Sequence, residues 1–186
     1  MPGDWCDGNQ RRVILTKEFN IFVTVGSTDF DALIQAVDTL APSLHATGVM
    51  QIGHGQYLPV NWPYFRFAPS LSPYYEQASL VIAHGGLGIT MEVLRRGLPL
   101  VSVSNPDRHD NHQEDLLSTM AEEGYLVWCR RLDELQQAIA TAQTTPLRHY
   151  QPPQCEIHVV INEFLHAHNR RHYGRKIPER QEGISI

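Results

Sequence analysis

Short apolar runs alternate with segments of helical periodicity along most of the chain. The first run, Ile21–Val25, is rich in β-branched and aromatic residues, as expected of a buried strand, and Gly26 follows it directly. Apolar positions then recur at helical spacing over residues 30–40, where Asp29 is placed to cap the helix and Pro42 to end it. A strand followed by a helix predicts the first half of a βαβ unit.

The same alternation continues to about residue 142. It predicts further strands near Val49–Ile52, Phe65–Phe67, Leu80–Ala83, Leu100–Val103 and Tyr125–Trp128. It predicts helices near Pro73–Ala78, Ile89–Arg96, His112–Glu123 and Leu132–Ala142, with Gly97 and Gly124 at helix C-caps. This order indicates the α/β class, a single Rossmann-like open parallel sheet with helices on both faces. Ligands of such sheets bind at the carboxyl ends of the strands, so the loops that follow the strands are the candidate sites.

The composition is typical of one globular domain with enough apolar residues to form a hydrophobic core. The 186 residues are 42% hydrophobic and 19% charged, and the net charge of −5 argues against a large footprint on duplex DNA, so we expect no nucleic-acid partner. No apolar run approaches the roughly 20 residues of a membrane-spanning helix, and the first twenty residues lack the apolar region of a secretory signal. We therefore expect a cytoplasmic protein.

The three cysteines, Cys6, Cys129 and Cys155, are an odd number without metal-ligand spacing. This favours reduced thiols over a disulfide framework, with Cys129 as a small core residue.

We expect an N-terminal extension over residues 1–20, a ligand-binding domain over 21–168 and a basic, mobile tail over 169–186. Within the second part, the apolar positions of Ile157–Leu165 predict an amphipathic helix. That helix either packs on the sheet or contacts a partner, and the basic tail after it either stays solvated or approaches anionic lipid headgroups.

The segment from His84 to Glu92 carries the clearest chemistry, because it follows a predicted strand and opens a predicted helix. Glycines let the backbone approach an anion, and the free amides of a first helical turn point at it, so a diphosphate fits here. Thr90 is placed to donate to a phosphate oxygen and Glu92 to accept from ribose hydroxyls. A tight structural turn is the alternative interpretation.

A second polar loop runs from Ser104 to Gln113, again after a predicted strand. Asn111, His112 and Gln113 offer donors and acceptors suited to the hydroxyls of a sugar ring. Alternatively, Asp110 or Asn111 only caps the helix. A metal site would draw on Asp107, His109, Asp110 and His112, but their spacing matches no established metal motif, so we expect no metal.

Two weaker candidates lie in the loops after the first two strands. Ser27 follows Gly26 in a small polar turn, and His54 lies in the glycine-flanked sequence Gly53–Gly55. Either loop is able to contact a phosphate, although a solvated histidine is the more common outcome for His54.

Five segments occur in one order along the chain: Phe22–Thr28, Gln51–Gly55, Ala83–Gly88, Gly97–Leu100 and Asp110–Gln113. Together they resemble the donor-binding half of a GT-B glycosyltransferase, over about residues 20–145. Similar proteins include the small soluble subunit of the two-part GlcNAc transferase of N-glycan lipid precursors and bacterial exopolysaccharide E-subunits. The C-terminal domain of the lipid II-forming GlcNAc transferase is also similar.

The resemblance implies roles for the matching residues of this sequence. Gly86, Gly88 and Thr90 would bind the donor's diphosphate, Glu92 its ribose, and His112 and Gln113 the sugar hydroxyls. The backbone at Phe67 and Ala68 would contact the uracil edge and Ser27 a phosphate; His84, Gly85 and Asn111 complete the donor-binding set. The sequence departs from the family at His54, where some relatives have Arg or Lys, and in residues 1–20, which have no counterpart.

A GT-B enzyme has two lobes, and this chain supplies one. The resemblance therefore implies the donor-binding subunit of an inverting, metal-independent glycosyltransferase without cofactor. Its partner would be a membrane-associated subunit that binds a lipid-linked acceptor. The general base is not identified, with His84 as the one candidate, and the sequence does not distinguish GlcNAc, glucuronic acid and glucose as the sugar. Two other classes stay open: a non-catalytic module that binds a nucleotide sugar, and a metal-dependent hydrolase centred on His109 and His112.

Overall fold

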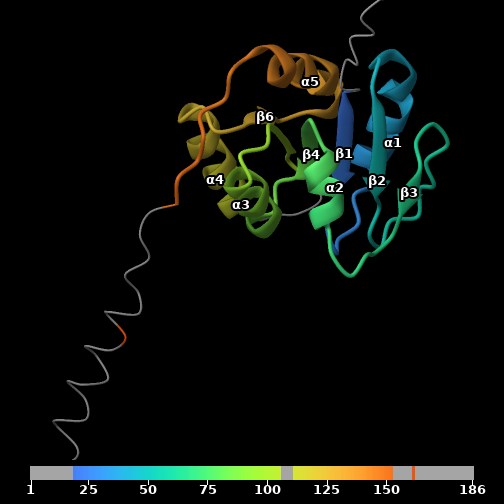
Figure 1. The fold of residues 1–186 in the computed structure, drawn as a ribbon, viewed down its shortest axis with the longest axis horizontal. Coiled ribbons are helices and arrows are strands. Elements are labelled where there is room, and N and C mark those ends of the chain that lie inside the picture. Colours follow the sequence, from blue (N-terminus) through green and yellow to red (C-terminus); the bar gives the residue numbers. More distant parts are fainter. Residues whose placement is uncertain (1–18, 106–110, 153–160, 162–186) are drawn as a thin grey trace, which may run out of the picture. The chain divides into compact units, whose positions relative to one another are not determined.

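The computed structural model describes residues 19–105, 111–152 and 161 and contains one six-stranded sheet (Figure 1). The strands are β1 (Asn20–Thr24), β2 (Thr47–Gln51), β3 (Tyr64–Phe65), β4 (Leu80–His84), β5 (Leu100–Val103) and β6 (Val127–Cys129). All neighbouring pairs are parallel, in the order β3-β2-β1-β4-β5-β6. The chain first builds outward from β1 through β2 to β3 and then returns to β4 on the other side. The switch point of this doubly wound sheet therefore lies between β1 and β4.

Helices cover both faces of the sheet, as the sequence predicts (Figure 1). Helices α1 (Asp31–Leu40) and α5 (Leu135–Thr144) pack on one face, and α2 (Ser72–Gln77), α3 (Leu87–Arg95) and α4 (Asn111–Glu122) pack on the other. Strand residues alternate between the two cores: Val23 faces the first and Phe22 the second. This alternation follows from the period of two in a strand, and it directs apolar side chains of the central strands β1, β4 and β5 toward both cores.

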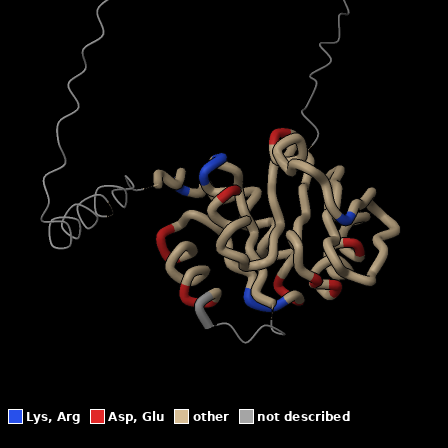
Figure 2. Tube along the Cα trace, turned by 90° about the horizontal axis from the view of Figure 1, so that it is seen from below, with Lys and Arg blue, Asp and Glu red and all other residues tan. Residues whose placement is uncertain are grey.

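Charged residues are confined to helices and loops, and no described strand contains Lys, Arg, Asp or Glu (Figure 2). Among the described residues, no helix is long and apolar enough to cross a membrane.

Element boundaries differ from the prediction where loop contacts decide them. Asp29 does not cap the first helix: the N-cap is Phe30, and no side chain caps it. Asp31, the first residue of the helix, makes a different contact: both of its carboxylate oxygens accept from Gln56 N–H at 2.9 Å. Strand β3 has only two residues, so Phe67 lies in the loop after it, and the last helix is preceded by a 3₁₀ turn at Leu132–Glu134.

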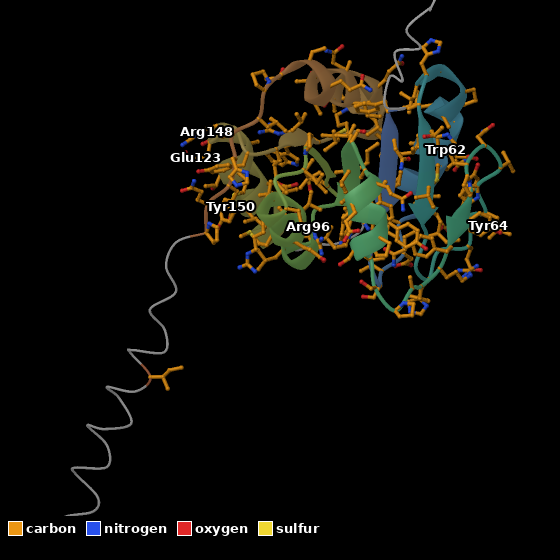
Figure 3. The ribbon with its side chains drawn as sticks, viewed as in Figure 1. Trp62, Tyr64, Arg96, Glu123, Arg148 and Tyr150 are labelled. Atoms are coloured by element: carbon orange, nitrogen blue, oxygen red, sulfur yellow. The ribbon has the colours of Figure 1, made fainter. Side chains whose placement is uncertain are left out.

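Gly97 and Gly124 end helices α3 and α4 with positive φ angles of 69° and 77°, as predicted for helix C-caps. The segment after α5 crosses this end of the domain, where the N–H of Arg148 donates to Gly124 O at 2.9 Å. The guanidinium of Arg148 also donates to the Glu123 carboxylate at 2.8 Å, and both lie near Tyr150 (Figure 3). These contacts attach residues 145–150 to the domain.

The chain divides into two compact units, residues 1–150 and residues 151–186. The predicted domain boundaries stay predictions, because residues 1–18, the predicted helix 157–165 except Ile161, and the tail lie outside the described residues. Cys129 is a buried core residue, as predicted, and burial raises the pKa of its thiol to about 11.

Candidate functional site

Two loops meet at the switch point between β1 and β4. Gly26, directly after Val25, has a φ of 65°, and a Cβ at this position would lie 3.4 Å from His84 Cε1 and 2.9 Å from Ile89 Cδ1. The turn after β1 therefore packs directly on the residues that open α3. Only glycine combines this backbone conformation with so close an approach.

The loop between β4 and α3 is short and glycine-lined. His84 is buried as the last residue of β4, Gly85 N–H donates to Val103 O at 3.0 Å, and Gly86 is the N-cap of α3. The amides of the first turn, at residues 87–89, have no acceptor within the helix. Gly88 is exposed, and a Cβ built on it would have no neighbour within 4 Å. Open space thus lies beside free amides at a helix N-terminus, which suits an anion.

Thr90 and Glu92 lie further along α3 in different surroundings. Thr90 is fully buried, its N–H donates to Gly86 O at 3.0 Å, and its hydroxyl has no hydrogen-bond partner within the described chain. Glu92 is partly exposed and accepts from the Arg96 guanidinium at 3.2 Å. Glu92 also lines a surface hollow of about 470 Å³ together with Gly88 and Met91. The carboxylate is accessible to a ligand, whereas the Thr90 hydroxyl is covered.

The predicted sugar-binding loop meets the glycine loop through Gln113. Its Oε1 lies 3.7 Å from the position of a Cβ on Gly85, so the start of α4 lies beside the start of α3. The side chains of Asn111 and His112, and all of residues 106–110, lie outside the described part of the chain. The residues of the alternative metal site are among these, so the structure does not describe that site. In the part of the chain that is described, no three His, Cys, Asp or Glu residues are grouped to hold a metal.

The loops after β1, β2 and β3 form a second wall of the site. Ser27 is exposed, and Phe67 is 51% exposed with its ring 4.9 Å from the ring of His54. His54 N–H donates to Thr28 O at 3.2 Å, which ties the loop after β2 to the turn after β1. The structure thus places His54 beside the predicted uracil-contacting segment Phe67–Ala68.

Two polar residues that the sequence interpretation left without a role hold this wall together. The Gln51 carboxamide contacts Thr24, Gly26 and Arg66, and the Arg66 guanidinium donates to Gly53 O at 3.2 Å and Gly55 O at 2.7 Å. Gln51 had one recognisable signal in the sequence, as a polar residue within the predicted apolar strand Val49–Ile52. Arg66 had none, because its acceptors are backbone carbonyls that only the loop conformation brings together.

Comparison with known proteins places the chain in a family. Residues 20–169 match the model of the Glycosyltransferase family 28 C-terminal domain. The chain belongs to this family. The resemblance seen in the sequence is therefore confirmed.

Several proteins are similar over the same region. The UDP-N-acetylglucosamine transferase subunit ALG13 of Homo sapiens is 37% identical over 123 residues, which is 59% of this chain and 11% of that protein. The mouse protein of the same name is 36% identical over 58% of this chain and 10% of its own length. The matched region is thus a small fraction of these relatives.

Solved structures share the fold. MurG of Acinetobacter baumannii superimposes with a TM-score of 0.58 at 23% identity, over 69% of this chain and 42% of that chain. A solution structure of ALG13 superimposes with a TM-score of 0.55 at 21% identity, over 77% of this chain and 94% of that chain. The predicted Rossmann-like sheet of the GT-B type is confirmed.

Proposed function

We propose that this chain is the donor-binding subunit of an inverting glycosyltransferase that uses a UDP-sugar, GlcNAc or a similar hexose. The observation that carries the proposal is the convergence of three loops at the switch point: Gly26 packs on His84, and Gln113 lies beside Gly85. The family and the printed function of the human and mouse relatives support UDP-GlcNAc as the donor.

In this proposal the diphosphate lies at the N-terminus of α3. The first-turn amides beside Gly86 and Gly88 donate to phosphate oxygens, the Glu92 carboxylate accepts from the ribose, and the Phe67–Ala68 backbone contacts the uracil. Thr90 supports the first turn of α3 and does not contact the diphosphate itself, because its hydroxyl is buried and its N–H donates to Gly86 O. Gln113, with Asn111 and His112 at the same helix start, binds the sugar hydroxyls.

The reaction is a displacement at the anomeric carbon. The acceptor hydroxyl oxygen forms the new bond to this carbon, and the bond to the phosphate oxygen breaks with its electron pair passing to UDP. Negative charge grows on the leaving diphosphate, where fixed amides of α3 stabilise it. This contribution makes a divalent cation dispensable, and we propose a metal-independent enzyme. The hydroxyl proton passes to a base that the acceptor-binding subunit supplies.

The partner we propose is a membrane-associated subunit that holds a lipid-linked acceptor. A GT-B site closes between two lobes, and the described domain forms one parallel sheet, which corresponds to one lobe. Deletion of the chain from Cys155 onward tests whether the C-terminal segment makes this contact: we expect loss of co-purification with the partner. Undiminished co-purification would place the contact elsewhere.

Calorimetric titration with UDP, UDP-GlcNAc, UDP-glucose and UDP-glucuronic acid tests the donor assignment. We expect binding of UDP and a preference for one sugar nucleotide. Transfer of radiolabelled sugar by the reconstituted pair, in the presence of a chelator, then tests catalysis and metal independence together. Binding without transfer would favour a regulatory module, and transfer abolished by the chelator would contradict the metal-independent mechanism.

A further inference from the structure

The carboxamide of Gln51 is at the centre of a closed hydrogen-bond ring beneath the candidate site. Gln51 is 4% exposed at the end of β2. Its NH₂ group donates to Gly26 O at 2.9 Å and to Arg66 O at 3.3 Å, while its Oε1 accepts from the Thr24 hydroxyl. The Thr24 oxygen in turn accepts from Gly26 N–H at 3.2 Å. One side chain therefore joins the turn after β1 to the loop after β3.

This ring fixes which way the carboxamide faces. Rotation of the carboxamide by 180° would place its oxygen against two carbonyl oxygens and leave both of them without a donor. A buried polar group without its partner costs free energy, so the observed orientation is held from three sides.

The orientation of Gln51 sets the direction of two peptide units. In a trans peptide the C=O and the following N–H point in opposite directions, and no described peptide bond is cis. Because Gly26 O and Arg66 O point toward Gln51, the N–H groups of Ser27 and Phe67 point away from it. Neither N–H donates to another residue in the ranges that the structure describes. Ser27 and Phe67 are also exposed.

We propose that Gln51 is a positioning residue that aims two backbone donors at one ligand: Ser27 N–H at a phosphate oxygen and Phe67 N–H at a carbonyl oxygen of the nucleobase. The ligand class is a pyrimidine nucleoside diphosphate with a base carbonyl that accepts from the backbone. This inference rests on the proposed function, because that function places the donor nucleotide at these loops. It goes further by naming the buried residue that orients the backbone of these two loops toward the nucleotide.

The decisive variant is Gln51→Glu, which keeps the size of the side chain and the acceptor for Thr24 but cannot donate to either carbonyl when ionised and can donate to only one of them when protonated. We expect its dissociation constant for UDP, measured by titration calorimetry on the full chain, to rise about tenfold or more. Gln35→Glu makes the same chemical change on the exposed side of α1 and should leave UDP binding unchanged. Met50→Ala removes core volume from the same strand and controls for lost stability.

Amide signals in ¹H–¹⁵N spectra separate positioning from a merely structural role. In the unchanged protein the signals of Ser27, Phe67 and Gly88 should all move on addition of UDP. In Gln51→Glu the responses of Ser27 and Phe67 should be lost while Gly88 still responds, and in Met50→Ala all three should remain. If Gln51→Glu does not fold, Thr24→Val, which removes only the hydroxyl, and the spectra of the unchanged protein still test the assignment.

The outcomes distinguish this inference from the function it rests on. An unchanged protein that does not bind UDP would overturn both. An unchanged protein that binds UDP without any response of Ser27 and Phe67 would overturn the positioning role alone. Equal UDP affinity of Gln51→Glu and the unchanged protein would do the same.

Discussion

The backbone of Gly86 lies directly against the imidazole of His84: a Cβ on Gly86 would come within 2.4 Å of His84 Nε2. His84 is itself buried and contacts the turn at Gly26, so it cannot move aside without disturbing the loop after β1. The glycine is therefore required by the protein's own packing, before any ligand is considered. Within one loop, Gly86 is thus needed for packing, whereas Gly88, which has open space around it, is needed only if a ligand approaches.

Gly86→Ala and Gly88→Ala are thus expected to behave differently. Gly86→Ala should lower the free energy of unfolding by about 1–3 kcal/mol through overpacking, and should weaken UDP binding as a result. Gly88→Ala has open space around its new methyl group and replaces glycine in a helix, so stability should rise by up to about 1 kcal/mol.

UDP affinity should nevertheless fall in Gly88→Ala, because the methyl group occupies the space beside the first-turn amides. Urea unfolding and calorimetric titration measure the two effects. A Gly88→Ala protein that binds UDP as tightly as the unchanged protein would show that the diphosphate does not approach this turn.

Glu92→Ala removes the proposed ribose acceptor. We expect UDP binding to weaken by about 1–3 kcal/mol, because the ribose hydroxyls lose a charged partner. Stability should change by about 0.5 kcal/mol or less, since the ion pair with Arg96 is partly exposed. Arg96→Ala breaks the same ion pair and leaves the carboxylate in place, so its UDP affinity should stay near that of the unchanged protein. Similar losses in both variants would assign the effect to the ion pair instead.

Gln113→Ala should weaken the contacts to the sugar and leave the binding of the nucleotide unchanged. Its carboxamide lies beside Gly85 at the proposed sugar end of the site, so affinity for UDP should be unchanged. Transfer by the reconstituted pair should fall about tenfold or more in kcat/KM, as hydrogen bonds to sugar hydroxyls are lost. The neighbouring variant Glu114→Ala changes an exposed side chain and should have no effect on either measurement. Weakened binding of UDP itself in Gln113→Ala would contradict the assignment to the sugar.

Asp38 should control the acid stability of the domain. It is buried on α1 and accepts from the Tyr57 hydroxyl at 2.8 Å, Val60 N–H at 3.0 Å and Asn61 N–H at 2.9 Å. Burial acts to raise the pKa of its carboxyl, but these hydrogen bonds, with the Asn61 side chain, hold that pKa below its ordinary value. A lowered pKa in the folded state stabilises the protein above the unfolded pKa, and that contribution is lost as the pH falls through the folded value.

The free energy of unfolding should therefore decrease below about pH 4 in the unchanged protein. Asp38→Asn should be less stable at pH 7 by about 1–3 kcal/mol and should depend less on pH in the acid range. Denaturant unfolding at a series of pH values measures both. Asp133, whose pKa is lowered by a hydrogen bond from exposed Arg131, is a surface control: Asp133→Asn should leave the acid profile nearly unchanged. An Asp38→Asn profile parallel to that of the unchanged protein would contradict this role.

The sequence by itself determined the class of fold and most of its elements. Strands such as Leu100–Val103 are apolar on both faces, which only a sheet covered on both sides satisfies, and the glycines at 97 and 124 marked helix ends through their backbone freedom. The glycine loop at 84–88 was also predictable, because its place between a strand and a helix is a local property of the chain.

Only the tertiary structure decided how the loops combine into a site. The sequence places Asp29 to cap the first helix, but no side chain caps it in the structure, and the carboxylate of Asp31 accepts from the N–H of Gln56, 25 residues away. Gln51 and Arg66 gain their roles from backbone carbonyls of other loops, and Thr90 is buried although its position in α3 suggested a phosphate donor. The spacing of apolar residues shows which face of a helix or strand is buried. It does so because apolar side chains are favoured on the buried face wherever that element lies in the fold. Hydrogen bonds between loops depend on the directions of individual peptide units, which are fixed only when the strands have assembled.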